Sequence, residues 1–226
     1  MGLMKLPLDI ILVPPSVALI IGYHVVLWCI LKTQPLRTRT GITAMRRRMW
    51  ALTLMENGSE GMLGVQSLRN SLMAAILAST IAIFTNSALA AMMNNIYNAH
   101  KLLHLSPFGS QGDSIILLKY SLSSIFLLAS FFCSSLGIGF LTEANFLINV
   151  TEGATAKTAH TMLELGSELA SVGNRVLFAA VPVLLWMFGP VSMAVSSVLL
   201  VCFFYDRDFN SGCRSGDANH DSASQF

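Results

Sequence analysis

The chain has 226 residues, of which 54% are hydrophobic and only 12% are charged, and its formal net charge is +2. A soluble domain carries about twice this fraction of charged residues, and here the hydrophobic residues gather in long blocks instead of short amphipathic stripes. The composition therefore excludes an ordinary soluble domain and predicts an integral membrane protein. The small net charge argues against nucleic acid as a partner.

Four apolar blocks are each long enough to cross a bilayer as a helix, for which ~20 residues suffice. They cover residues 8–31, 72–93, 115–141 and 176–204. The last block is longer than a straight crossing needs, and its two prolines predict a kink or a tilt. We expect an all-α integral membrane four-helix bundle over residues 1–205, followed by a disordered polar tail over residues 206–226.

Two polar connections, 32–71 and 142–175, are predicted to contain amphipathic helix segments. The first is strongly basic, and the positive-inside rule therefore places both connections in the cytosol and both termini outside. Within it, three consecutive arginines stand close to a tryptophan, a residue type that favours the headgroup layer. We expect this group to bind anionic lipid headgroups; its members are Arg46, Arg47, Arg48 and Trp50.

A weak internal repeat favours two related helix hairpins. Residues 9–12 resemble 114–117, and residues 70–75 resemble 175–180, at one common offset because 114 − 9 equals 175 − 70. Hairpins related in this way would have the same orientation, as in carriers built from parallel repeats. Chance similarity between apolar helices is the alternative.

Polar residues within or next to the spans are candidates for function, because they are costly in lipid. His24 could relay protons or bind a ligand, or it could be neutral and hydrogen-bonded to a neighbouring helix. Arg69 and Arg175 could snorkel to headgroups or converge with nearby amides at the cytosolic mouth of the bundle and receive an anionic group. The candidate ligand or pathway residues are His24, Gln66, Arg69, Asn70, Asn174 and Arg175.

The sequence contains no phosphate loop, nucleophile elbow or HExxH motif, and its four cysteines lack CxxC spacing. We therefore expect no catalytic residue, metal site or cofactor. Two function classes remain open. One is a small transport or channel component, which would act as a homo-oligomer or with another membrane partner because four spans rarely enclose a pathway. The other is a non-catalytic membrane adaptor or assembly factor that presents charged cytosolic loops.

Several motifs resemble those of one membrane family. They are Thr33-Gln34-Pro35-Leu36, Val65-Gln66-Ser67-Leu68-Arg69-Asn70 and Gly173-Asn174-Arg175, together with Tyr23-His24, Trp28, Arg47-Arg48-Met49-Trp50, Trp186 and Gly189-Pro190. This set is similar to plant-type members of the family catalogued as domain of unknown function 599, and the resemblance extends to about Phe209. It implies a four-span membrane protein, an architecture without a mechanism.

Overall fold

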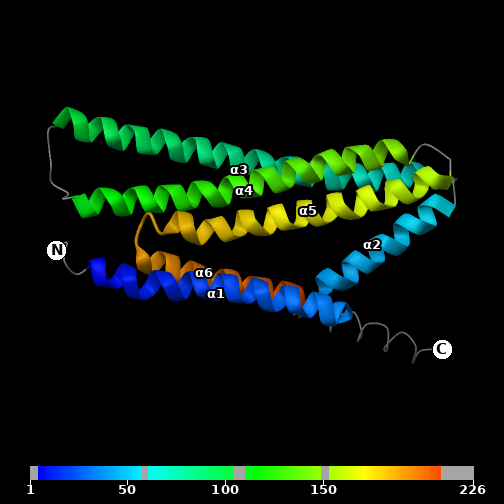
Figure 1. The fold of residues 1–226 in the computed structure, drawn as a ribbon, viewed down its shortest axis with the longest axis horizontal. Helices are drawn as coiled ribbons and strands as arrows, with labels where there is room; N and C mark the ends of the chain where they lie inside the picture. The colour runs from blue at the N-terminus through cyan, green and yellow to red at the C-terminus, as the bar shows by residue number, and fades with distance from the viewer. Residues whose placement is uncertain (1–4, 57–60, 104–109, 149–152, 210–226) are drawn as a thin grey trace, which may run out of the picture. The chain divides into compact units, whose positions relative to one another are not determined.

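The computed structural model describes residues 5–56, 61–103, 110–148 and 153–209. These residues form six α-helices and one short 3-10 helix, with no strand among them, so the expected all-α class is confirmed. In chain order the elements are α1 (Lys5–Thr33), η1 (Pro35–Arg37), α2 (Arg39–Glu56), α3 (Gly61–Leu103), α4 (Ser110–Leu147), α5 (Gly153–Leu185) and α6 (Pro190–Phe209) (Figure 1).

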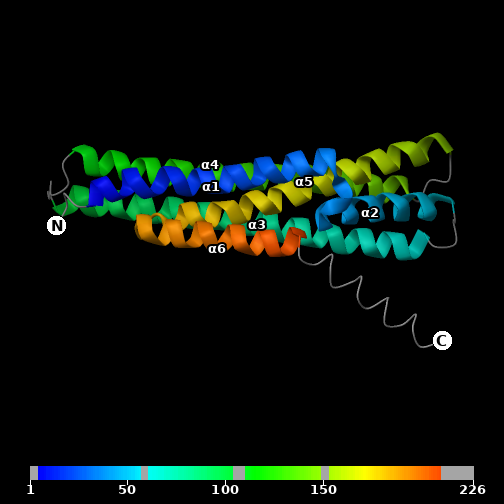
Figure 2. The same cartoon turned by 90° about the horizontal axis from the view of Figure 1, so that it is seen from below.

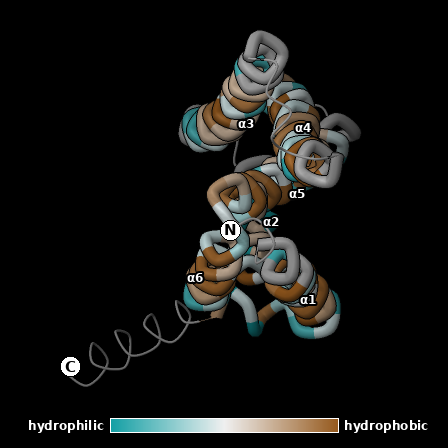
Figure 3. Tube along the Cα trace, turned by 90° about the vertical axis from the view of Figure 1, so that its left-hand side faces the viewer, coloured by the Kyte–Doolittle hydropathy of each residue, from teal (hydrophilic) through white to brown (hydrophobic). Residues whose placement is uncertain are grey.

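Five of these helices are long and apolar enough to cross a membrane, and the chain is a multi-pass integral membrane protein. At most 33% of the apolar window of any one of them is buried. Hydrophobic residues occur along the helices (Figure 3), and many of the large ones are exposed. That surface is available to lipid. The candidate spans are Ile11–Thr33, Gly64–Asn95, Ile115–Leu147, Lys157–Leu185 and Pro190–Phe209.

The count of five corrects the expected count of four, because the block at residues 176–204 is two helices and not one kinked helix. Helix α5 passes through Pro182 but ends at Leu185. Gly189 then adopts a φ of +152°, a backbone angle that residues other than glycine rarely adopt. Pro190 is the first residue of α6, a position that suits proline because its missing N–H would have no partner there.

The expected cytosolic connections are also largely helical. Helix α4 continues to Leu147 and α5 already begins at Gly153, so most of the predicted loop 142–175 belongs to two long helices. The amphipathic segment that starts near Met162 is continuous with the apolar block after it, because both have helical spacing. Helix α6 likewise continues to Phe209, four residues into the expected tail, and residues 210–226 lie outside the described part.

The chain divides into two compact units. Unit 1 comprises Met1–Trp50 and Phe188–Phe226, and in it α1 and α6 lie side by side and run in the same direction (Figures 1 and 2). Unit 2 comprises Ala51–Met187, and in it α3, α4 and α5 pack in antiparallel order. Because α1 and α3 belong to different units while α4 and α5 pack together, the two expected hairpins are not equivalent.

The contact between α4 and α5 depends on glycine. A Cβ atom at Gly137 would lie 2.9 Å from the backbone nitrogen of Ala170, and one at Gly173 would lie 2.9 Å from that of Ser134. The backbones of α4 and α5 therefore lie close together. Small residues at the interface permit this close approach. Toward the other end of unit 2, a small core of Leu89, Leu127 and Ala180 joins all three helices.

Candidate functional site

Hydrogen bonds between helices fix the register of unit 2. The hydroxyl of Ser130 on α4 donates to the carbonyl of Gly173 on α5 at 2.7 Å. The hydroxyl of Ser124 donates to Oδ1 of Asn86 on α3 at 2.8 Å. Serine hydrogen bonds of this kind link helices inside an apolar bundle.

Arg175 lies close to the contact between α4 and α5 in unit 2. It follows Gly173 by two residues, so it stands level with Ser130, which is central in the span Ile115–Leu147. Only 8% of Arg175 is exposed. Two residues are about 200° of helix rotation, so its side chain leaves α5 on the face opposite the α4 contact. On insertion scales a cation at the centre of a span costs about 3 kcal/mol. The two interpretations of Arg175 from sequence, snorkelling and binding of an anionic group, stay predictions.

Arg69 occupies a different level from Arg175. Ser79 on α3 pairs with Ser135 on α4 at 3.3 Å, and Arg69 precedes Ser79 by ten residues. In an antiparallel pair this puts Arg69 opposite residue 145 or so, about 25 Å along the axis from the Arg175 level at 1.5 Å per residue. The structure therefore does not bring the two arginines together. Gln66, Arg69 and Asn70 are exposed, and Asn174 is half-buried.

A second cation, Lys119, lies at the C-terminal end of α5. Nζ of Lys119 donates to the carbonyl oxygen of Trp186 at 3.1 Å and lies 5.1 Å from the centroid of its ring. Carbonyls at a helix C-terminus lack intrahelical partners and carry partial negative charge, so a lysine there stabilises the helix end. The role of Lys119 could not be predicted from the sequence, because it depends on the end of α5 at Leu185. The sequence favoured one continuous helix there.

In unit 1, Asp208 joins three segments that are far apart in the sequence. Its side chain is buried, with 1% exposed. Tyr23 on α1 donates its hydroxyl to Oδ2 at 2.7 Å, and Thr40 on α2 donates to Oδ1 at 2.8 Å. We call these three residues the Asp208 node. No sequence signal pointed to it, because Asp208 falls in the segment expected to be a disordered tail.

His24 lies beside the node but turns toward its own helix. Its Nδ1 is 2.8 Å from the carbonyl oxygen of Ile20, and a carbonyl can only accept, so the hydrogen bond needs a proton on Nδ1. The ring packs edge-on against Phe204 at a centroid distance of 5.7 Å. The half-buried His24 is therefore hydrogen-bonded within its own helix and not, as one interpretation from sequence expected, to a neighbouring helix.

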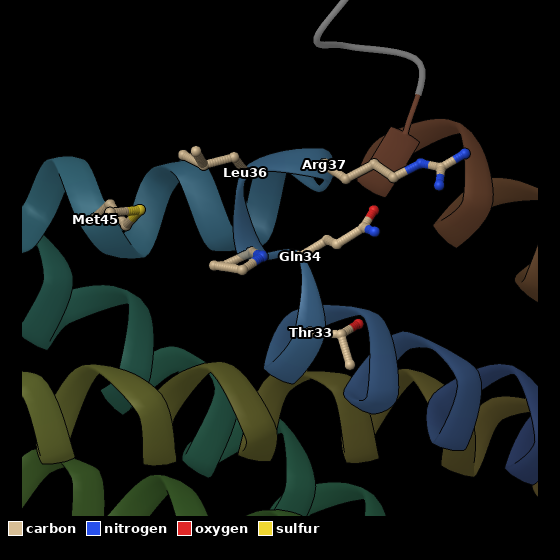
Figure 4. A pocket seen from close by; sticks show the side chains of 6 residues that line it. Thr33, Gln34, Leu36, Arg37 and Met45 are labelled. Atoms are coloured by element: carbon tan, nitrogen blue, oxygen red, sulfur yellow. The ribbon is translucent and has the colours of Figure 1, made fainter.

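The chain turns sharply between α1 and α2. A Cβ atom at Gly41 would collide with the backbone of Pro35, coming within 2.8 Å of its carbonyl carbon, and the buried Thr38 accepts a hydrogen bond from the Gly41 N–H at 3.2 Å. An open hollow lies at this turn (Figure 4). We call it the elbow recess; its lining residues are Thr33, Gln34, Pro35, Leu36, Arg37 and Met45.

Helix α2 presents the arginine triplet. Arg46, Arg47 and Arg48 are exposed and Trp50 is half-buried. None of the three arginines forms a hydrogen bond or an ion pair with another described residue. The triplet thus remains a predicted binding surface for anionic headgroups. Within the described ranges, no group of three or more His, Cys, Asp or Glu residues is placed to hold a metal ion.

A known family model matches most of the chain. The model of a family described as "Protein of unknown function, DUF599" matches residues 11–213. This stretch contains all five candidate spans and every candidate residue named above. No curated protein and no solved structure shows significant similarity to the chain.

Proposed function

We propose that this chain, which belongs to the DUF599 family, is a small non-catalytic component of an anion transporter or channel that acts as an oligomer. The match confirms the resemblance seen in the sequence motifs, and the architecture it implied is refined here from four spans to five. The family description names no activity. The proposal therefore rests on the site alone.

Arg175 is the observation that carries the proposal. A guanidinium group keeps its charge at any physiological pH, and an ionisable residue within a span is a functional candidate by default because its position is costly. A fixed cation at mid-membrane lowers the electrostatic barrier for an anion and raises it for a cation. Arg175 is suited to this role because it stands level with the centre of the α4 span.

An oligomer would supply the rest of the pathway. Unit 2 contributes only three spans and unit 1 only two, which is few for a polar pathway shielded from lipid. Small residues on the outer side of α4 support close packing with another copy. Ala129 and Gly139 are exposed, and a Cβ atom at Gly139 would have no neighbour within 4 Å.

We further propose that the N-terminus is outside and the C-terminus is in the cytosol. An odd number of spans puts the termini on opposite sides, which replaces the expectation that both are outside. With this orientation ten of the 14 lysines and arginines face the cytosol, in accordance with the positive-inside rule. They are Lys32, Arg37, Arg39, Arg46, Arg47, Arg48, Arg69, Lys157, Arg207 and Arg214; Lys5, Lys101 and Lys119 face the outside.

The test is anion flux in sealed liposomes containing the full-length protein, measured with chloride and nitrate. Arg175→Gln should reduce the flux at least tenfold, because it removes the fixed charge at mid-membrane. Arg69→Gln removes the same charge from an exposed position and is the matched control; His24→Ala tests the predicted pathway role of that residue. Flux that survives Arg175→Gln, or a membrane that stays tight to both anions, would reject the proposal.

The second candidate function is a membrane adaptor, and the exposed arginine triplet of α2 favours it. The helix carries three adjacent cations on a segment held at its N-terminus by the Thr40–Asp208 hydrogen bond. Such a helix is suited to bind an acidic partner. If the protein is an adaptor, charge reversal of the triplet should abolish cross-linking to that partner in native membranes. The same change should leave anion flux unchanged. The transport proposal instead predicts that Arg175→Gln reduces the flux and does not affect the cross-linking.

A further inference from the structure

The elbow recess has a polar side formed by Gln34 and Arg37. Their side chains extend in the same direction from the turn between α1 and α2 (Figure 4). Both residues are exposed, and within the described part of the chain neither side chain has a hydrogen-bond or ion-pair partner. A guanidinium matches the geometry of a phosphate with two parallel N–H donors, and the amide of Gln34 adds a further donor.

The other side of the recess is apolar. Leu36 is 68% exposed and Met45 is 48% exposed, and Pro35 completes the wall. Hydrophobic side chains this open to solvent next to a convergent pair of donors suggest a ligand that is itself amphipathic. Inorganic phosphate would use only the donors. A phospholipid would also cover the wall with the start of an acyl chain.

The recess also lies at the level of the headgroups. The first candidate span ends at Thr33, which is the first lining residue of the recess. Lys32 directly precedes Thr33, and its Nζ lies 4.0 Å from the centroid of the ring of the exposed Trp28, one turn earlier in α1. Tryptophan and snorkelling lysine mark the boundary between hydrocarbon and water, so the donors of the recess fall just outside the hydrocarbon.

Three contacts keep the recess in shape without a ligand. The close approach of Gly41 to Pro35 fixes the turn. The hydrogen bond from Thr40 to Asp208 holds the start of α2 against the end of α6, and the bond from Tyr23 to the same carboxylate holds α1 there. A site organised in advance loses less conformational entropy when it binds.

We infer that the elbow recess is a binding site for one anionic phospholipid, with Arg37 and Gln34 on the phosphate and with Leu36 and Met45 against the acyl chain. The phosphate alone does not distinguish lipids, since zwitterionic lipids carry it too. The net negative charge does, because Arg37 has no acidic partner among the described residues and the Arg46–Arg48 triplet follows in α2. This site does not depend on the proposed transport function.

The test is lipid binding to the intact purified protein, followed by native mass spectrometry in a neutral detergent. Phosphatidylglycerol, phosphatidylcholine and inorganic phosphate are titrated separately against wild type, Arg37→Gln, Arg37→Lys and Arg39→Gln. Arg39 is the matched control, because it is exposed, equally charged, two residues away and outside the recess. Leu36→Asn tests the apolar wall.

We expect one phosphatidylglycerol to bind more tightly than phosphatidylcholine, with roughly tenfold weaker binding in Arg37→Gln and an intermediate loss in Arg37→Lys, which keeps the charge but not the fork. Arg39→Gln should stay within twofold of wild type, and Leu36→Asn should weaken lipid binding as well. Equal losses in the Arg37→Gln and Arg39→Gln variants would show general electrostatic attraction and overturn the site. Equal binding of phosphatidylcholine, or tight binding of inorganic phosphate, would also overturn the assignment to an anionic lipid.

Discussion

Replacement of Gly173 by alanine tests the α4–α5 packing that sets Arg175 level with Ser130. The new Cβ atom would meet Oγ of Ser134, lie 2.9 Å from the backbone nitrogen of Ser134 and lie 3.1 Å from the carbonyl oxygen of Ser130. The two backbone atoms cannot rotate away, so the helices must separate locally. Overpacking of this kind costs about 1–3 kcal/mol.

Gly139→Ala is the matched control on α4. A Cβ atom there would have no neighbour within 4 Å, so only the helix propensity changes, a gain of up to about 1 kcal/mol. Gly173→Ala receives the same gain, and the overpacking term is therefore the difference between the two variants. We expect Gly173→Ala to be less stable than Gly139→Ala by about 1–3 kcal/mol.

The assay is reversible unfolding in mixed micelles with increasing SDS, followed by circular dichroism. The double variant Gly173→Ala/Ser134→Gly should recover only part of the lost stability, since it removes Oγ of Ser134 but leaves the two backbone contacts. Equal unfolding midpoints for the two single alanine variants would refute the packing, and with it the level assigned to Arg175.

Three further predictions follow from the described contacts. Asp208→Asn should destabilise the protein by about 1–3 kcal/mol, seen as a lower thermal midpoint, because the carboxylate accepts from both Tyr23 and Thr40 and an amide offers one acceptor oxygen. Lys119→Met should cost about 1 kcal/mol in SDS unfolding, because it removes the cation from the carbonyl and ring of Trp186; an unchanged midpoint would contradict that role. In sealed vesicles of known orientation, epitope tags at the two termini should be accessible from opposite sides, and tags on the same side would contradict five spans.

The apolar blocks were sufficient to predict the membrane class and the approximate positions of the first three candidate spans. Block length alone did not show that the last block contains two helices. Proline is tolerated within α5 at Pro182 but begins a new helix at Pro190, and the difference comes from Gly189, whose φ of +152° stops the helix. The dipeptide Gly189-Pro190 is the sequence signal for this break. The same dipeptide is also compatible with a kink in one continuous helix.

The burial of Arg175 and the Asp208 node could not be predicted from local sequence. Arg175 precedes an apolar stretch much as Arg69 does, and only the packing of the helices separates a buried arginine from an exposed one. The Asp208 node depends on contacts across 185 and 168 residues, which no periodicity within one segment can show. The exposed arginine triplet of α2, by contrast, was evident from composition alone.

The Asp208 node also sets the order in which the protein can be completed during synthesis. Thr40 and Asp208 are 168 residues apart, and at the usual ribosomal rate of 5–20 residues per second this separation takes roughly 8–34 s to translate. Until then α1 and the start of α2 are in the membrane without the carboxylate that joins them. A chain that stops before the last helix therefore lacks the carboxylate that joins α1 to the start of α2, and unit 1 stays incomplete.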